Sequence, residues 1–387
     1  MHRFVVLLVL ALAPTLLTAG EDDGEHIRQR FEDMRMRRIP RGGAVDMAAR
    51  SRAIDITQRA SLRAPEQVLD ARTWKSVGPM ATAGRIKSII VDPTTPNVIY
   101  AAAAAGGVWK STNGGDSWMP IMDDANGIAM GTLSFDPSSP STIYAGTGEQ
   151  VTGANIFLGA GVLRSTNAGT TWEVVGLTSV GSCSRIMIPP SQPSTIYVAG
   201  MNEHGGLWKS TDRGLSWKRI AEGDVYDASL HPTNHSTIIM AMRDVGIIRS
   251  IDGGATWEPT SGLSGRIGRI SVQHAPSNGS IVYALCELDD RATIAASRDG
   301  GATWRVVYRD STGCFFAGTC QTKDSQGFYD NVIAVCPTSS DTVIAGGIDL
   351  LRTTDGGATW TNVTTGYADG NGNNHPHVDQ HAICFDP

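Results

Sequence analysis

The sequence predicts an all-β fold, a β-propeller of four-stranded blades, and three observations lead to it. One eight-residue pattern ending in Trp occurs six times in the 387 residues, with 40 to 56 residues between successive Trp positions. Short apolar runs precede each copy, and another short segment follows it. The 44 Gly and 18 Pro supply turns between many short strands. A repeat of roughly 40 to 50 residues with four strands is typical of a propeller blade.

The first twenty residues have the pattern of a signal peptide. Arg3 precedes an apolar run at 4–13, and the small residues at 18–20 offer a cleavage site. The run is too short to span a membrane, so we predict a secreted or periplasmic protein with no membrane span after cleavage. Apolar positions at helical spacing predict a helical or extended leader at 21–73, and the propeller is predicted over 74–387.

The repeated pattern is predicted to be a tight turn between the third and fourth strands of each blade. Its Asn or Asp accepts hydrogen bonds from backbone amides just downstream, and the Gly two positions later supplies a positive φ. The Trp begins the next strand and fills the space between neighbouring blades. We therefore expect a structural role for these positions in every copy. They are Asn113, Asn167, Asp212, Asp252, Asp299 and Asp355, with Trp118, Trp172, Trp217, Trp257, Trp304 and Trp360.

These copies, with the stretches at 74–79 and 108–111, resemble the Asp-box (BNR) repeat of sialidases, of the sortilin (VPS10) ectodomain and of xyloglucanase-type glycoside hydrolases. The resemblance covers 74–387 and is greatest to secreted bacterial sortilin-type BNR proteins, to which HVDQHAICFDP at 377–387 is also similar. It implies a propeller that works outside the cell. Because the last residues match the ends of earlier first strands, we predict six complete blades and the start of a seventh, truncated at the C-terminus.

Strand order predicts that all six turns lie on one face of the propeller, the box face. The opposite face, which we call the loop face, carries the connections between second and third strands and between consecutive blades. Four of these are predicted to be long, at 147–160, 287–291, 310–326 and 364–374. Elaborated loops carry function more often than scaffold turns do, so ligand binding is expected there. The candidate ligand residues are Glu149, Asp289, Asp290, Asp330, His377, Asp379 and His381.

The starts of the innermost strands are predicted to surround the channel mouth on the loop face. Counting eight residues back from the proline that ends each strand, or its equivalent, gives a polar ring of mixed charge. Its members are Arg85, Ala129, Ser182, Asp224, Arg266, Tyr329 and Asp379. We interpret this ring as a solvated channel lining.

The segment 375–381 holds the densest cluster of potential metal ligands. In an extended strand His375, His377, Asp379 and His381 share one side, and imidazoles with a carboxylate can bind a transition metal. Hydrogen bonds from this strand to neighbouring loops account for the same residues without an ion. We therefore predict no metal and no other cofactor.

The six cysteines are few for this length, so the fold is not expected to depend on disulfides. Cys314 and Cys320 can close a small loop, because Gly318 between them permits a tight return. Cys336 and Cys384 lie in apolar, strand-like runs and are interpreted as buried thiols. The formal net charge of −6 argues against a nucleic-acid partner. No oligomeric state is predicted.

Glycoside hydrolysis needs two carboxylates that flank the scissile bond. The xyloglucanase-type resemblance implies a catalytic base in the loop after the second strand of blade one, where Ala104 stands. A Gly-x-Ser-x-Gly elbow and a sialidase-type arginine triad are also missing from the sequence. We therefore predict a secreted, non-catalytic scaffold that binds an extracellular protein, peptide or polysaccharide through its loop face. The alternative is a glycoside hydrolase, xyloglucanase-like or sialidase-like, whose active site is completed by further C-terminal blades.

Overall fold

The computed structural model describes residues 84–125, 129–150, 157–317, 325–364 and 378–386, together with Ala49, Arg52, Ala53 and Ile56. The predicted signal peptide lies outside the described residues, and so does the predicted leader apart from these four residues, which are helical. His375 and His377 also lie outside them. Within the described part, no helix is long and apolar enough to cross a membrane.

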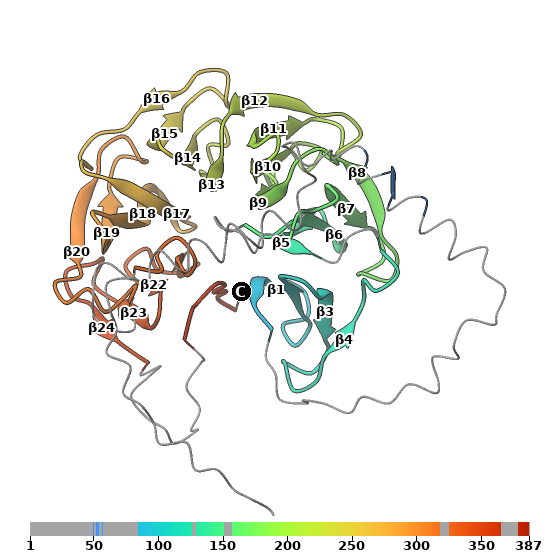
Figure 1. The fold of residues 1–387 in the computed structure, drawn as a ribbon, viewed down its shortest axis with the longest axis horizontal. Helices are drawn as coiled ribbons and strands as arrows, with labels where there is room; N and C mark the ends of the chain where they lie inside the picture. The colour runs from blue at the N-terminus through green and yellow to red at the C-terminus, as the bar shows by residue number, and fades with distance from the viewer. Residues whose placement is uncertain are drawn as a thin grey trace, which may run out of the picture. The chain divides into compact units, whose positions relative to one another are not determined.

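Six antiparallel sheets of four strands succeed one another along the chain (Figure 1). Blade one has β1 (Ile86–Val91), β2 (Ile99–Ala103), β3 (Gly107–Ser111) and β4 (Met119–Pro120), and blade two has β5 (Met130–Asp136), β6 (Ser139–Thr147), β7 (Val162–Ser165) and β8 (Glu173–Gly176). Blade three has β9 (Ser182–Met187), β10 (Ile196–Met201), β11 (Gly206–Ser210) and β12 (Lys218–Glu222), and blade four has β13 (Val225–Leu230), β14 (Ile238–Met242), β15 (Gly246–Ser250) and β16 (Glu258–Pro259). Blade five has β17 (Ile267–Ala275), β18 (Asn278–Leu288), β19 (Arg291–Ser297) and β20 (Arg305–Arg309), and blade six has β21 (Val332–Val335), β22 (Val343–Gly346), β23 (Leu350–Thr353) and β24 (Thr361–Asn362). The predicted all-β propeller of four-stranded blades is confirmed.

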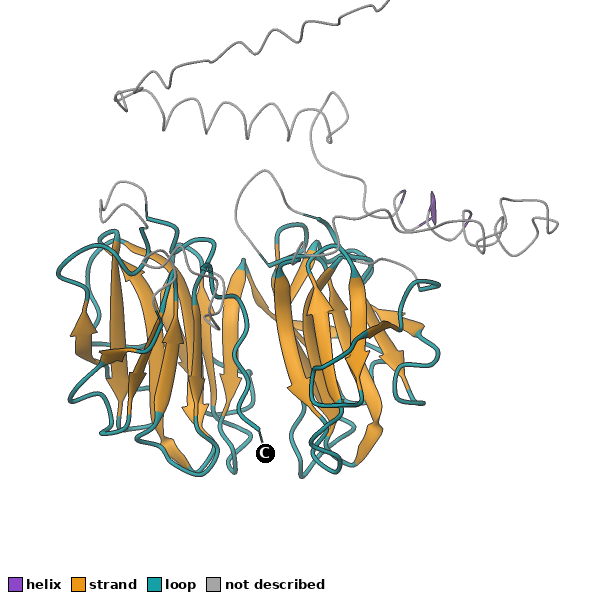
Figure 2. Ribbon diagram, turned by 90° about the horizontal axis from the view of Figure 1, so that it is seen from below, coloured by secondary structure: helices purple, strands orange, loops and turns teal. Residues whose placement is uncertain are grey.

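Within each blade every strand pairs with its neighbours in sequence, so the strands alternate in direction. The strands run between two layers of connecting loops (Figure 2). Each repeated turn joins the third and fourth strands, on the same side as the connection from first to second strand. The connections from second to third strand and from blade to blade therefore share the loop face.

The hydrophobic core lies in the spaces between consecutive blades. Tyr100 and Val108 of blade one pack in one cluster with Met130 and Leu133 of blade two. Four further clusters in the described part join blades two and three, three and four, four and five, and five and six. Each sheet of blades two to five therefore buries both faces against its neighbours, and blades one and six each bury one face in these clusters.

The repeated turns share one hydrogen-bond pattern. In blade six the Asp355 carboxylate accepts from the Thr359 amide at 2.9 Å and the Thr359 hydroxyl at 2.6 Å. The Thr353 hydroxyl donates to Asp355 at 2.7 Å and accepts from the Gly357 amide at 3.0 Å. These bonds, first those from Thr359, lower the pKa of Asp355 to about 2. The equivalent Asn or Asp accepts in the same way in the other five copies.

The Trp of the turn contacts the preceding blade. Trp172 donates its indole N–H to the carbonyl of Ile121, and Trp217 donates to the carbonyl of Val175, each at 2.9 Å. In five copies an aliphatic side chain of the preceding blade also lies close to the last glycine of the turn. In blade one, only Trp118 itself lies near Gly115, and Trp118 is 38% exposed.

Two expectations about loops and cysteines need correction. The connection at 287–291 is short: β18 and β19 are joined by Asp289 and Asp290 alone, which take φ values of 51° and 60°. The two strands stay paired up to this turn, so no residues are left over for a longer loop. Cys336 is half-buried and Cys384 exposed, so these two are not buried thiols. Cys314 is disulfide-bonded, and Cys320 lies outside the described residues.

The segment 378–386 lies between blades six and one, with its end near β1 (Figure 1). The amide of Gln380 donates to the carbonyl of Gly347 at 2.8 Å, which ties the segment to the end of blade six. His381 and the following residues to Phe385 line the same cavity as residues of the innermost strands. The segment thus lines the central channel, and none of its described residues belongs to a strand.

Candidate carboxylate cluster at the channel mouth

Glu149, at the channel mouth, forms an ion pair with an arginine from another blade. It follows β6 by two residues and is fully buried. Arg85, just before β1, donates to both oxygens of the carboxylate, with Nη2 to Oε2 at 2.8 Å. Arg85 also donates to the hydroxyl of Tyr329, just before β21, at 3.0 Å. One guanidinium therefore joins the second-to-third-strand loop of blade two to the first strands of blades one and six.

Asp330, the neighbour of Tyr329, is a buried acid that carries its proton at neutral pH. Its exposed fraction is 0%, and within the described part of the chain neither carboxyl oxygen has a hydrogen-bond partner. Burial, and then the charge of Asp379, raises the pKa of Asp330 to about 9. A carboxyl group in this state can donate a proton, whereas Glu149 forms an ion pair with Arg85.

Asp289 and Asp290 belong to the rim of blade five. Asp289 accepts from the amide of Arg266 at 2.9 Å and from the guanidinium of Arg309 at 3.0 Å, and these bonds lower its pKa. Asp290 forms an ion pair with Arg266. Both carboxylates are used to hold the hairpin turn, so the structure separates them in role from Glu149 and Asp330.

His381 lies against Tyr329, with ring centroids 4.5 Å apart and the rings edge to face. Burial, and then the positive charges of Lys87 and Arg269, lowers the pKa of His381, so the imidazole is neutral. Asp379 acts electrostatically on Asp330 from the same segment. His377 lies outside the described residues. Among described side chains, no group of three or more His, Cys, Asp or Glu is arranged to hold a metal ion.

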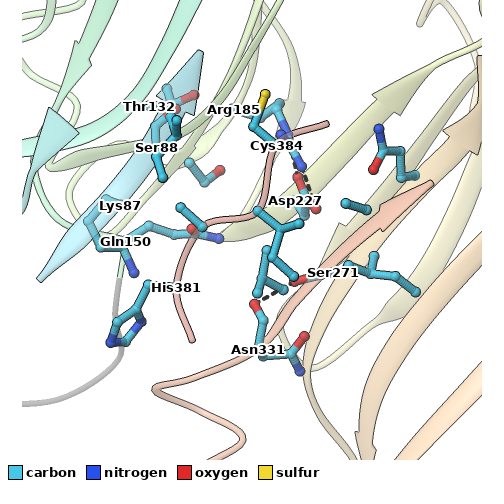
Figure 3. Close-up of a pocket in the computed structure, with 18 of the residues that line it drawn as sticks. Lys87, Ser88, Thr132, Gln150, Arg185, Asp227, Ser271, Asn331, His381 and Cys384 are labelled. Atoms are coloured by element: carbon cyan, nitrogen blue, oxygen red, sulfur yellow. Dashed lines mark hydrogen bonds and ion pairs between the residues drawn. The ribbon is translucent and has the colours of Figure 1, made fainter. Parts of the chain in front are cut away.

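A polar cavity of about 310 Å³ occupies the channel beside this cluster (Figure 3). Of the predicted candidate residues that the structure describes, only His381 lines it. Glu149 and Asp330 do not line the cavity themselves, but the residues that follow them, Gln150 and Asn331, do. The other lining residues that matter below are Lys87, Arg185, Asp227 and Arg269.

The sequence contained a signal for these lining residues, of which only His381 was named as a candidate. Lys87, Asn331 and His381 each lie two positions beyond a member of the predicted ring, and Arg269 lies three beyond. Alternate residues of a strand share a face, so the ring residues and those two positions further along face the same channel. The ring marks the rim of the channel, and the next inward-facing position marks its interior.

Comparison with known proteins places the fold among BNR-type propellers. The family model described as sortilin, neurotensin receptor 3 matches residues 205–334. A xyloglucanase from Paenibacillus is 27% identical over 256 residues, which cover 62% of this chain and 23% of that protein. A xyloglucanase from Acetivibrio thermocellus is 24% identical over 340 residues, which cover 75% of this chain and 39% of that protein. The chain thus spans well under half of these curated relatives.

A solved structure gives the same fold. The GH74 xyloglucanase from Xanthomonas campestris superposes with a TM-score of 0.58 at 18% identity, covering 79% of this chain and 49% of that one. The predicted resemblance to sortilin-type BNR propellers is therefore confirmed. The prediction of a non-catalytic scaffold is wrong by the same comparisons, because the relatives are xyloglucanases. The prediction rested on Ala104, on the missing arginine triad and Gly-x-Ser-x-Gly elbow, and on the sortilin-type resemblance; it named Glu149 and Asp330 as candidates but assigned no pair among the carboxylates.

Proposed function

We propose that this propeller is a glycoside hydrolase that acts on a polysaccharide of the xyloglucan type, at the mouth of its channel on the loop face. The similarity to xyloglucanases over 75% of the chain supports the reaction class. The single observation that carries the proposal is Asp330, a buried carboxylic acid with a pKa of about 9, whose neighbour Tyr329 is linked through Arg85 to the ion-paired carboxylate Glu149. A polymeric substrate also fits action outside the cell, for which the apolar run at 4–13 is the sequence argument.

Asp330 has the property that a general acid needs. Cleavage of a glycosidic bond requires protonation of the leaving oxygen, and the acid must hold its proton at working pH. An ordinary aspartate has lost it by then, but burial keeps Asp330 protonated. The absence of a described hydrogen-bond partner leaves that proton available.

Glu149 is the proposed second carboxylate. Ala104, directly after β2, has no ionisable group, so blade one offers no base at the position that the xyloglucanase resemblance implies. Glu149 occupies the corresponding loop of the next blade, two residues after β6. Arg85 donates both to the Glu149 carboxylate and to the Tyr329 hydroxyl, so Glu149 shares a hydrogen-bonded group with the residue that precedes Asp330. One carboxyl is thus kept protonated by burial and the other is ion-paired with an arginine, which suits the roles of acid and base.

The proposal is tested by assaying release of reducing ends from xyloglucan and from an unsubstituted β-glucan. Asp330→Asn and Glu149→Gln should each lower the rate by about 100-fold or more, because each removes one partner in proton transfer. Asp290→Asn, at the rim, is the matched control and should retain the wild-type rate. Thermal unfolding of each variant checks that the fold is intact.

Two outcomes would overturn the assignment. Hydrolysis at the wild-type rate by folded Asp330→Asn would exclude this residue as the acid. A wild-type protein that releases no reducing ends from either polysaccharide would exclude the proposed reaction for this chain.

A further inference from the structure

Two buried basic side chains that line the channel each have a nitrogen without a hydrogen-bond acceptor in the described part of the chain. Lys87, the second residue of β1, is 6% exposed, and Arg269, the third residue of β17, is 4% exposed. In the described part of the chain Lys87 Nζ and Arg269 Nε have no hydrogen-bond partner. Both side chains line the cavity of about 310 Å³, where Figure 3 draws Lys87 beside Gln150 and His381. Unpaired buried donors of this kind are uncommon and call for an explanation.

The neighbouring acids do not neutralise these cations. Glu149 is engaged by Arg85, and the Asp227 carboxylate is engaged by Arg185 at 2.8 and 3.0 Å. Asp330 is protonated, with its pKa raised to about 9 by burial. These carboxylates are thus used in other ion pairs, and in the described part of the chain neither Lys87 nor Arg269 forms an ion pair with an acid.

The electrostatics of Lys87 reflect this imbalance. Burial, and then the charge of Arg269, lowers the pKa of Lys87 well below its ordinary value. An anion between the two groups would offset both effects, because it restores a charge-assisted hydrogen bond to each donor. The cavity volume lies at the low end of the range of small-molecule sites.

The number of free donors selects the kind of anion. The terminal nitrogens of Arg269 already donate, Nη1 to the Phe328 and Tyr329 carbonyls at 3.3 and 2.7 Å and Nη2 to Gln150 Oε1 at 3.5 Å, and Nε is the guanidinium nitrogen with no partner in the described part of the chain. With Lys87 Nζ this makes two donor groups, which match the two oxygens of a carboxylate. Asn331 Oδ1, in the same wall, has no hydrogen-bond partner in the described part of the chain, so a ligand that carries several hydroxyl donors beside its acid group fits this lining better than inorganic phosphate does.

We propose that this end of the channel is a binding site for a carboxylate-bearing sugar, with Lys87 and Arg269 as the groups that recognise the acid. The surrounding polar side chains of Gln150, Asn331 and His381 are neutral partners suited to sugar hydroxyls. The site is distinct from the Asp330 and Glu149 pair, and its test uses binding alone. It can therefore fail or succeed independently of hydrolysis.

The experiment is isothermal titration calorimetry of the full chain with D-glucuronate. Its methyl ester serves as the matched neutral ligand, and inorganic phosphate as the competing anion. Lys87→Met keeps the aliphatic stem and removes the charge, and since Lys87 Nζ makes no hydrogen bond, this variant should fold. Lys218→Met, at an exposed position of β12, is the control. We expect glucuronate to bind the wild type and the control equally, and Lys87→Met roughly tenfold or more weakly.

The ester should bind at least about tenfold more weakly than glucuronate, because it lacks the charge. Equal binding of acid and ester, or unchanged binding by folded Lys87→Met, would overturn the proposal. Phosphate binding as tight as glucuronate binding would show a site for small inorganic anions and would overturn the assignment to a carboxylate. If none of the three ligands gave a measurable heat of binding, the proposal would also be overturned.

Discussion

Asp330 links the proposed chemistry to the pH dependence of stability. Its pKa is about 9 in the folded protein, raised by burial and by Asp379 from an ordinary value of 3.8. Between these two values the folded chain binds one more proton at this site than the unfolded chain does. The contribution of Asp330 to stability is therefore complete below the lower value and is lost as the pH rises towards the higher one.

Asp330→Asn should remove this dependence, because an amide is neutral at every pH. Relative to the wild type, the variant should gain stability from about pH 5 to about pH 8, by up to about 1 kcal/mol per pH unit. Denaturant unfolding at three pH values measures the difference. A difference that stays constant over this range would contradict the buried, protonated state of Asp330.

The carboxylates of the repeated turns have the opposite behaviour. Asp355→Ala should lower the melting temperature by a few degrees, because it removes the acceptor for the Thr359 amide and hydroxyl. The pKa of Asp355 is lowered to about 2, so its contribution is present above its ordinary value and is lost as the pH falls towards 2. The difference in melting temperature between the variant and the wild type should therefore become smaller at acidic pH. Asp116→Ala, an exposed position in the blade-one turn, is the control, and hydrolysis by Asp355→Ala should persist.

At the scale of the element, the turn glycines show how one blade fits against the next. Gly301 has a φ of 87°, and a Cβ added there would lie 2.2 Å from Ile239 Cδ1 in blade four. Gly300, its neighbour, has a φ of 67°, but a Cβ there would meet nothing closer than 3.6 Å. The pair separates backbone strain, which both positions share, from steric overlap between blades.

Gly301→Ala should therefore destabilise the protein clearly more than Gly300→Ala does. Strain at positive φ costs about 1 kcal/mol in either variant, and overpacking adds about 1 to 3 kcal/mol only at Gly301. Chemical denaturation of the two variants and the wild type measures this. If the two variants lost the same unfolding free energy, the blades would be able to move apart at the turn and relieve the overlap at Gly301.

The strands and turns of the blades could be predicted from sequence because they follow from local residue order. The repeated turn needs an Asn or Asp, a glycine and a Trp at fixed offsets, so each copy can be recognised in the sequence. The hairpin at Asp289 and Asp290 was missed because it lacks a glycine; two aspartates take the left-handed conformation that glycine usually supplies. Loop length was judged from composition, whereas strand pairing up to Leu288 and from Arg291 decides it.

At the scale of the whole molecule, blades are also joined by ions. Arg213, in the turn of blade three, forms an ion pair with Asp136 at the end of β5 in blade two, and Asp136 is fully buried. Arg213→Met should cost on the order of 2 kcal/mol, because it leaves a buried carboxylate without its cation. Arg305→Met, exposed on β20, is the control for loss of a surface charge. Similar unfolding free energies for the two variants would refute a stabilising role for this pair.

The candidate site could not be assembled from sequence in the same way. Arg85 meets Glu149 across 64 residues and Tyr329 across 244, and only the closure of the ring brings them together. Glu149, Asp330 and His381 were placed on the loop face by strand order. Their partners and their state of protonation depend on burial among side chains from three blades, which no local pattern encodes.

The exposure of Trp118 has a practical use. Indoles that contact water emit at longer wavelength than buried ones and are reached by soluble quenchers, so Trp118, at 38% exposure, is a built-in optical reporter of the open side of blade one. The chain contains nine Trp, and subtracting the spectrum of Trp118→Phe from that of the wild type isolates its signal. Any surface that comes to cover that side of the blade would shift this difference emission to the blue and shield it from acrylamide.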